Sequence, residues 1–275
     1  MLGVIAAMAV VNLVYGITFP LLALVLDAQG ISKTLIGLNT IVQAAAIVVI
    51  APLAPGLLAR FQPARLMQGV AIGLAGMFIL AGWFPNIWFW FPLRFVIGAM
   101  TGILWIASEA LINDLAEENW RGRIIGIYSA VGAAGFALGP LMLIGTGSSG
   151  MLPFVSTSVV TLIAAIPLFW STHHHTLSQK ASNTGIWKVF WLAPTVMLAN
   201  VVYAATIESI STFFPLFGQE LGLDNHLALG LMTIIGVGGM ALALPLSWIA
   251  DHVNRLSMLL VCILLTMAGL LLMPA

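Results

Sequence analysis

Charge is scarce in this sequence, because charged residues make up only 7% of its 275 residues. Soluble globular domains carry about 25%. Hydrophobic residues account for 61% of the chain, so the composition excludes a soluble domain and indicates a membrane protein. Basic and acidic residues number nine each. No basic tract is present, so the chain lacks the positive surface that nucleic-acid binding requires.

Cysteine and clustered metal ligands are also nearly absent. The single cysteine, Cys262, lies in an apolar run, which excludes a disulfide framework and a cysteine-based metal site. His173, His174 and His175 are consecutive in a polar loop and point in different directions, so we expect no metal site there. The sequence has no nucleophile–base pair or carboxylate dyad with usable spacing. We therefore expect neither an enzyme nor a bound cofactor.

Long apolar runs fill most of the chain. The first run lacks a basic leader and a small-residue cleavage site, so we interpret it as a membrane span and not as a signal peptide. Windows of about 20 apolar residues predict about nine spans, at residues 2–26, 35–59, 66–84, 88–112, 124–144, 152–170, 187–217, 227–250 and 256–273. Helices satisfy their own backbone hydrogen bonds in lipid. The predicted fold class is therefore an all-α polytopic membrane protein.

The basic residues predict the orientation. With the N-terminus in the cytoplasm, most of them fall in or beside cytoplasmic loops, as the positive-inside rule requires: Arg60, Arg65, Arg121, Arg123, Lys180, Lys188 and Arg255. Only Lys33 falls outside, and Arg94 lies within a span. The longest polar connection, residues 171–185, then lies in the cytoplasm between the sixth and seventh spans.

Two ionisable residues, Arg94 and Glu109, lie within one apolar span. A charge near the bilayer centre costs roughly 3 kcal/mol or more, so such residues usually serve a pathway, a relay or an ion pair. Helical geometry places Gly98, Thr101 and Trp105 on the same stripe as Arg94, and separates Arg94 from Glu109 by roughly 22 Å. The two charges cannot pair with each other. Each therefore needs a partner on another helix, water in a cavity or, for Glu109, a bound proton.

Other polar residues in the spans are further candidates for a substrate or proton pathway. Glu208 lies toward the outer side of the seventh span, where it would face Arg94 across a central cavity; the alternative is an outer gate residue. The remaining candidates are Asn12, Tyr15, Trp105, Asn200 and Tyr203. Their alternative role is interhelical hydrogen bonding. Likewise, Arg94 and Glu109 are either a coupling or substrate pair, or two separate interhelical locks.

Small residues recur four positions apart in several spans. The pairs are Gly69 and Gly73, Gly98 and Gly102, and Gly135 and Gly139. Such pairs let two helices approach closely in a membrane, so we expect them to serve packing. Pro140 follows Gly139 and removes a backbone hydrogen bond, which predicts a bend in that helix.

An internal repeat links the first and seventh spans. Asn12, Tyr15 and Thr18 recur with the same spacing as Asn200, Tyr203 and Thr206. Each set is followed by a Phe-Pro pair and then by a polar turn that contains glycine. The seventh span thus resembles a restart of the first, which predicts two related halves.

Several motifs resemble those of the major facilitator superfamily and, within it, of the YcaD-like bacterial permeases. The latter likeness rests on residues 93–98 and 105–111. Arg94-x-x-x-Gly98 matches the family's fourth-span motif, whose arginine is linked to proton coupling in relatives. Gly135-x-x-x-Gly139-Pro140 resembles the fifth-span motif associated with antiporters. The resemblance implies a secondary transporter built from two helical bundles.

Charged loop residues resemble the family's gating motifs. Residues 247–255, which include Asp251 and Arg255, resemble the loop motif of the second half. In the first half, Arg60 stands where the family usually has an aspartate. The other charged residues in these loops are Arg65, Glu117, Arg121 and Arg123. The charged turn after the fourth span either pairs with Arg60 or Arg65 as a cytoplasmic gate closes, or is a solvated helix end that anchors the topology.

The resemblance implies a domain organisation. Residues 1–170 would form a six-helix bundle, residues 171–186 a cytoplasmic interdomain loop, and residues 187–275 a partial bundle of three helices. The chain would then lack the last three helices of the family. We expect a monomeric, proton-coupled exporter of a small organic solute in the bacterial cytoplasmic membrane. The alternative is a non-transporting membrane protein, either a fragment of an incomplete gene or a sensor or assembly subunit.

Overall fold

The chain folds into helices throughout the described region. A computed structural model describes residues 2–115, 121–170 and 194–271. Within these residues it contains ten helices and no strand: α1 (Leu2–Ala28), α2 (Lys33–Ile50), α3 (Ala54–Arg60), α4 (Pro63–Trp83), α5 (Ile87–Leu115), α6 (Arg121–Thr146), α7 (Leu152–Trp170), α9 (Pro194–Glu220), α10 (Asn225–His252) and α11 (Arg255–Leu271). The predicted interdomain loop at residues 171–186 lies outside the described residues.

Most of these helices can cross a membrane. Eight described helices are long and apolar enough to do so: α1, α2, α4, α5, α6, α7, α9 and α10. The ninth predicted span corresponds to α11, which has 17 residues and a shorter apolar stretch at Leu260–Gly269. The prediction of an all-α polytopic membrane protein is confirmed.

The second predicted span is shorter in the structure than in the sequence-based prediction. That span was expected to continue to residue 59, but α2 ends at Ile50 and α3 begins at Ala54. Pro52 falls in the break, and Pro55 lies in the first turn of α3. Proline lacks the backbone N–H that a continuous helix needs, but it is tolerated in a first turn. By contrast, α6 continues through Pro140.

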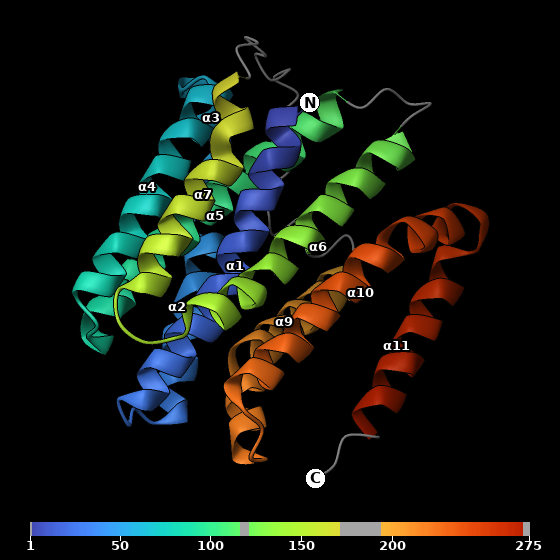
Figure 1. Cartoon of the computed structure of the whole chain (residues 1–275). Helices are drawn as coiled ribbons and strands as arrows, with labels where there is room; N and C mark the ends of the chain where they lie inside the picture. The colour runs from blue at the N-terminus through green and yellow to red at the C-terminus, as the bar shows by residue number, and fades with distance from the viewer. Residues whose placement is uncertain (1, 116–120, 171–193, 272–275) are drawn as a thin grey trace.

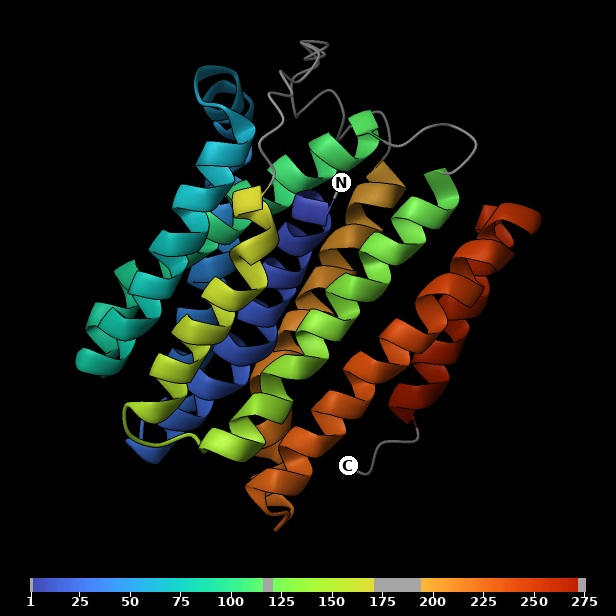
Figure 2. The same ribbon diagram turned by 45° about the horizontal axis from the view of Figure 1, so that its top comes forward.

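Helix α1 is the centre of the bundle. It contacts α5, α6, α7 and α9, and 83% of its apolar window is buried. Helix α6 lies between α1 and α10, and α9 packs against both α1 and α10 (Figure 1). Helix α11 lies on the far side of α10 in both views (Figure 2). The burial of α1 and its contacts with these helices place it at the centre.

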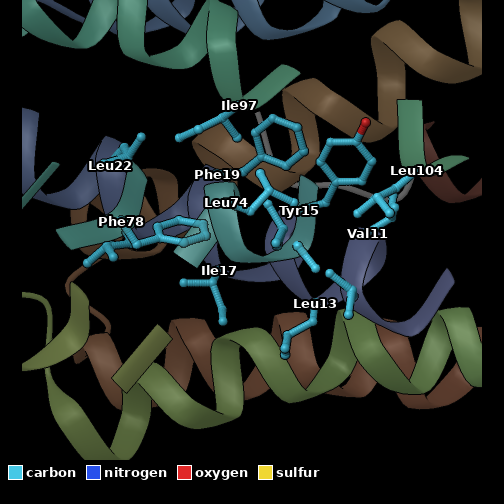
Figure 3. Close-up of a cluster of buried hydrophobic side chains, with 14 of the residues drawn as sticks. Val11, Leu13, Tyr15, Ile17, Phe19, Leu22, Leu74, Phe78, Ile97 and Leu104 are labelled. Carbon is cyan, nitrogen blue, oxygen red and sulfur yellow. The ribbon is translucent and has the colours of Figure 1, made fainter. Parts of the chain in front are cut away.

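The apolar core forms around α1. Figure 3 shows residues from α1 packed with Leu74 and Phe78 of α4 and with Ile97 and Leu104 of α5. These side chains are almost completely buried. The core therefore joins α1 to the first-half helices and fixes the position of the α1 face that carries Tyr15 and Phe19.

Glycine allows α1 and α6 to come into backbone contact. A Cβ atom at Gly139 would overlap the backbone of Gly16, and one at Gly16 would overlap the carbonyl of Phe136. Gly135 lies against the Ala9 carbonyl in the same interface. Small residues at a membrane helix interface permit this close approach. Gly69 differs, because a Cβ there would meet no atom within 4 Å.

We predict that Gly139→Ala destabilises the protein. The added methyl group has no room against the Gly16 backbone, and overpacking of this kind typically costs about 1–3 kcal/mol. Thermal unfolding of the purified protein in detergent should show a clearly lower melting temperature. Gly69→Ala is the matched control, and its effect should stay within about 0.5 kcal/mol. Equal melting temperatures for the two variants would contradict the close packing of α1 and α6.

Candidate functional site

Arg94 of α5 is the central residue of the site. Its side chain is 1% exposed. One guanidinium nitrogen, Nη1, donates a hydrogen bond to Thr40 Oγ1 on α2 at 2.8 Å, and Nη2 donates to the Thr18 carbonyl on α1 at 3.3 Å. The guanidinium carbon also lies 5.9 Å from the centroid of the Phe19 ring, within reach of a cation–π interaction. Three helices thus hold one buried positive charge.

Glu208 of α9 is the carboxylate that interacts electrostatically with Arg94. Glu208 is partly buried. In the described part of the chain, no carboxylate lies within ion-pair distance of Arg94. The interaction therefore acts across a gap. Charges inside a low-dielectric bundle are poorly screened, so such an interaction keeps its strength over a longer distance than it would in water.

An aromatic series connects Arg94 to Glu109. We use this term for Phe19, Tyr15 and Trp105. The Tyr15 ring stacks on Phe19 at 5.5 Å and 8°, and the two rings lie side by side in Figure 3. Trp105 meets Tyr15 edge to face at 6.2 Å, and its Nε1 donates to Glu109 Oε1 at 2.7 Å. Continuous ring contacts therefore link the two charges that are too far apart to pair.

Glu109 lies at the opposite end of this series and is exposed. Close by, the hydroxyl groups of Ser108 and Tyr128 share a hydrogen bond of 2.7 Å, which joins α5 to α6. Tyr128 also interacts electrostatically with Glu109. Glu109 is thus available to solvent, while its carboxylate is oriented by Trp105.

The other pathway candidates are distributed differently. Asn12 is half-buried beside Gly132 of α6, and its Nδ2 donates to the Met8 carbonyl of its own helix at 3.0 Å. Asn200 and Tyr203 are exposed on α9, and Tyr203 is 65% exposed. Among the described residues of α9, the buried positions begin at Ser211, beyond Asn200 and Tyr203. These two residues therefore do not join Arg94 here, and their place in a pathway stays a prediction.

The predicted gating residues lie apart from Arg94. Arg60, Arg65 and Arg123 are exposed at the ends of α3, α4 and α6. The side chains of the remaining members of this set lie outside the described residues: Glu117, Arg121, Asp251 and Arg255. Their pairing stays a prediction.

Sequence reasoning did not assign to the site four polar residues on the two helices that bond to Arg94. Thr18, Asn39, Thr40 and Gln43 are all buried, and the last three share one face of α2. A signal for them was present in the sequence. Asn39, Thr40 and Gln43 are spaced one, three and four residues apart within an apolar run, which places them on the same side of a helix.

Contacts between α2 and α9 close one end of the bundle. Lys33 at the start of α2 forms an ion pair with Glu220 at the end of α9. One turn further along α2, Gly37 lies against the Phe213 ring. Ser211 and Thr212, which precede Phe213 on α9, are buried. The half of α9 that carries Glu208 and Thr212 is thus held against the first-half helices.

We predict that breaking the Lys33–Glu220 pair loosens this end of the bundle. In a Cys262→Ser background, Thr212→Cys supplies a single buried thiol. Adding Lys33→Gln should raise its rate of maleimide labelling in detergent by up to about fivefold, since an exposed ion pair contributes about 0–1 kcal/mol. The charge swap Lys33→Glu with Glu220→Lys should restore slow labelling. An unchanged rate after Lys33→Gln would show that the pair does not hold α9.

Taken together, the fold and site define a polytopic helical membrane protein with a buried charge at the meeting point of three helices. Residues 4–275 match the family model of the Major Facilitator Superfamily, so the chain belongs to this superfamily. The predicted family is confirmed, and its members are transporters, not enzymes.

Similar proteins carry transporter names. An uncharacterized MFS-type transporter, YfkF of Bacillus subtilis, is 23% identical over 90% of this chain and 65% of its own length. An uncharacterized MFS-type transporter of Enterobacter is 25% identical over 74% of this chain and 53% of its own. The multidrug resistance protein MdtG of Serratia proteamaculans is 27% identical over 57% of this chain and 40% of its own. The chain thus spans less than two thirds of the length of these relatives.

Proposed function

We propose that the chain acts as a proton-coupled secondary transporter that exports a small organic solute by alternating access. The observation that carries this proposal is the fully buried Arg94 and its electrostatic interaction with Glu208 on α9. A buried charge in a membrane helix is costly and therefore usually functional. The similarity to proteins named for multidrug resistance supports an organic solute and outward transport.

The proposed movement is a rocking of two bundles. Residues 1–170 form the first bundle and residues 187–275 contribute to the second, with residues 171–186 as the cytoplasmic connection. Arg94 belongs to the first and Glu208 to the second. Their attraction favours the arrangement in which α9 lies against α1 and α2. Proton binding to Glu208 removes its charge, abolishes this attraction and lets α9 move away.

The aromatic series provides the route for the solute in this proposal. Phe19, Tyr15 and Trp105 offer an apolar and polarisable surface along α1 and α5. Glu109 at the solvent-exposed end accepts a hydrogen bond from Trp105, so a proton on Glu109 changes how that ring is held. Glu109 thus lies at one end of the proposed route, and Glu208, which interacts with Arg94, lies near the other end.

The membrane arrangement follows from the same proposal. The protein is a monomer in the bacterial cytoplasmic membrane, and its N-terminus is cytoplasmic. This orientation obeys the positive-inside rule for Arg60, Arg65 and Arg123, which are exposed at helix ends. The bacterial origin of the relatives YfkF and MdtG supports the choice of membrane.

Solute flux into proteoliposomes tests this function. The purified protein is reconstituted and assayed with a panel of small organic solutes, with and without a pH gradient. We expect at least one solute to be transported, and its flux to respond to the gradient. Flux that is the same with and without the pH gradient would contradict proton coupling. The absence of flux for every solute would favour the non-transporting alternative.

A further inference from the structure

Arg94 and three other buried side chains, on the helices that meet at Arg94, have hydrogen-bonding groups without a partner. Within the described part of the chain, both amide atoms of Asn39, both amide atoms of Gln43, Thr18 Oγ1 and Arg94 Nε make no hydrogen bond. Asn39, Gln43 and Thr18 are 0% exposed. Buried polar groups in folded proteins nearly always have a partner, because water is not available to replace it. Such a concentration of unmet groups therefore points to a ligand.

These groups lie in one region of the fold. Thr40 receives the hydrogen bond from Arg94, and Asn39 and Gln43 flank Thr40 on the buried face of α2. The main-chain carbonyl of Gln43 lies against Gly98, and Gly98 is one helical turn from Arg94 on α5. Thr18 contributes its carbonyl to the same guanidinium from α1. The unpartnered atoms thus belong to buried side chains of α1, α2 and α5, the three helices that meet at Arg94.

The chemistry of this junction selects a kind of ligand. The unpartnered donors are two carboxamide NH₂ groups, one hydroxyl and one guanidinium N–H, next to a fixed positive charge, and the unpartnered acceptors are the two carboxamide oxygens. A carboxylate or phosphonate oxygen accepts several such hydrogen bonds at once, and charge-assisted bonds of this kind are strong. The Phe19 and Tyr15 rings beside Arg94 offer an apolar surface for the rest of such a molecule.

We propose that Asn39, Gln43, Thr18 and Arg94 form a binding site for the anionic oxygen group of an organic acid. This inference rests on the proposed function, because the bound acid is the transported solute. The group enters when α9 moves away from α1 and α2, and it replaces Glu208 as the negative partner of Arg94. Asn39 and Gln43 then determine which oxygen group is accepted.

Binding of matched probes to the purified protein in detergent tests this site without requiring transport. Benzoate, phenylphosphonate, benzyl alcohol and benzylammonium share one ring and differ in their polar group. We expect benzoate or phenylphosphonate to raise the melting temperature, and the preference between these two to identify the oxygen group. The neutral and cationic probes should have no comparable effect. Equal effects of benzoate and benzyl alcohol would overturn the proposal.

Substitutions on α2 separate binding from folding. Asn39→Leu and Gln43→Met preserve approximate size and remove buried groups that lack partners, so the ligand-free melting temperature should not fall. Each should weaken binding of the preferred anion at least about tenfold, the effect of losing one hydrogen bond to a charged group. Thr161→Val is the control, since Thr161 is also buried and unpartnered but lies on α7. Anion binding that survives both α2 substitutions would refute the site.

The two proposals fail in different ways. Anion binding without flux in proteoliposomes would preserve the site and contradict the transport function. Flux of solutes without any preference for an anionic group would preserve transport and contradict the site.

Discussion

Replacing Arg94 with methionine abolishes solute flux and leaves the protein folded. Arg94→Met keeps a long side chain but removes the charge and the hydrogen bonds to Thr40 and to the Thr18 carbonyl. A hydrogen bond to a charged group contributes about 1.5–3 kcal/mol, so losing two of them corresponds to a fall in flux of about a hundredfold or more. Replacing Arg94 by an apolar side chain of similar length also removes the cost of desolvating a buried charge, which offsets the hydrogen bonds that are lost. The melting temperature should therefore stay close to that of the wild type.

This combination distinguishes a functional arginine from an interhelical lock. If Arg94 were only an interhelical lock, Arg94→Met would lower the melting temperature of the protein. Flux would then fall only in proportion to the fraction of protein that remains folded. Arg94→Lys is the informative control, because it keeps the charge but lacks the guanidinium that bonds to two helices at once. We expect intermediate flux from Arg94→Lys. Wild-type flux in Arg94→Met, measured in the same proteoliposomes, would show that the buried charge is not needed.

Replacing Glu208 with glutamine separates solute movement from proton movement. Glu208→Gln keeps the shape of the side chain and removes its ability to carry a proton or to attract Arg94. Solute exchange, in which labelled solute replaces unlabelled solute without net proton transfer, should persist. Uphill flux driven by a pH gradient should be lost, because glutamine cannot bind and release a proton.

Two other carboxylates serve as comparisons. Glu220 is exposed on the same helix and pairs with Lys33. Glu220→Gln therefore loosens that end of the bundle but leaves the interaction between Glu208 and Arg94 in place, so it should keep its response to the pH gradient. Glu109→Gln tests the opposite end of the aromatic series and should reduce the response if its proton takes part. If Glu208→Gln and Glu109→Gln both transport uphill as the wild type does, neither residue couples the proton.

The sequence predicted the helical class and the main charged positions for clear physical reasons. Apolar runs of span length identify membrane helices without knowledge of their packing. Arg94 stood out because a charge in such a run is costly. Helical spacing alone showed that Arg94 and Glu109 cannot pair, and the structure agrees, since Trp105 is the side chain that bonds to Glu109.

The sequence was less informative about tertiary contacts. The break between α2 and α3 depends on two prolines that lie near the end of an apolar run, where hydropathy still favours a span. The role of Asn39 and Gln43 depends on which face of α2 is buried, and hydropathy does not specify that face. The aromatic series joins α1 to α5, two helices separated in sequence by more than 50 residues, and so no local pattern reveals it.

Solute-driven proton movement tests the central claim most directly. Proteoliposomes containing the purified protein are loaded with a pH-sensitive dye, and a transported solute is added outside without an imposed pH gradient. If the protein couples solute movement to proton movement through Glu208, solute entry should change the luminal pH in the wild type and leave it unchanged in Glu208→Gln. Solute entry without any luminal pH change in the wild type, or an equal change in Glu208→Gln, would contradict the account.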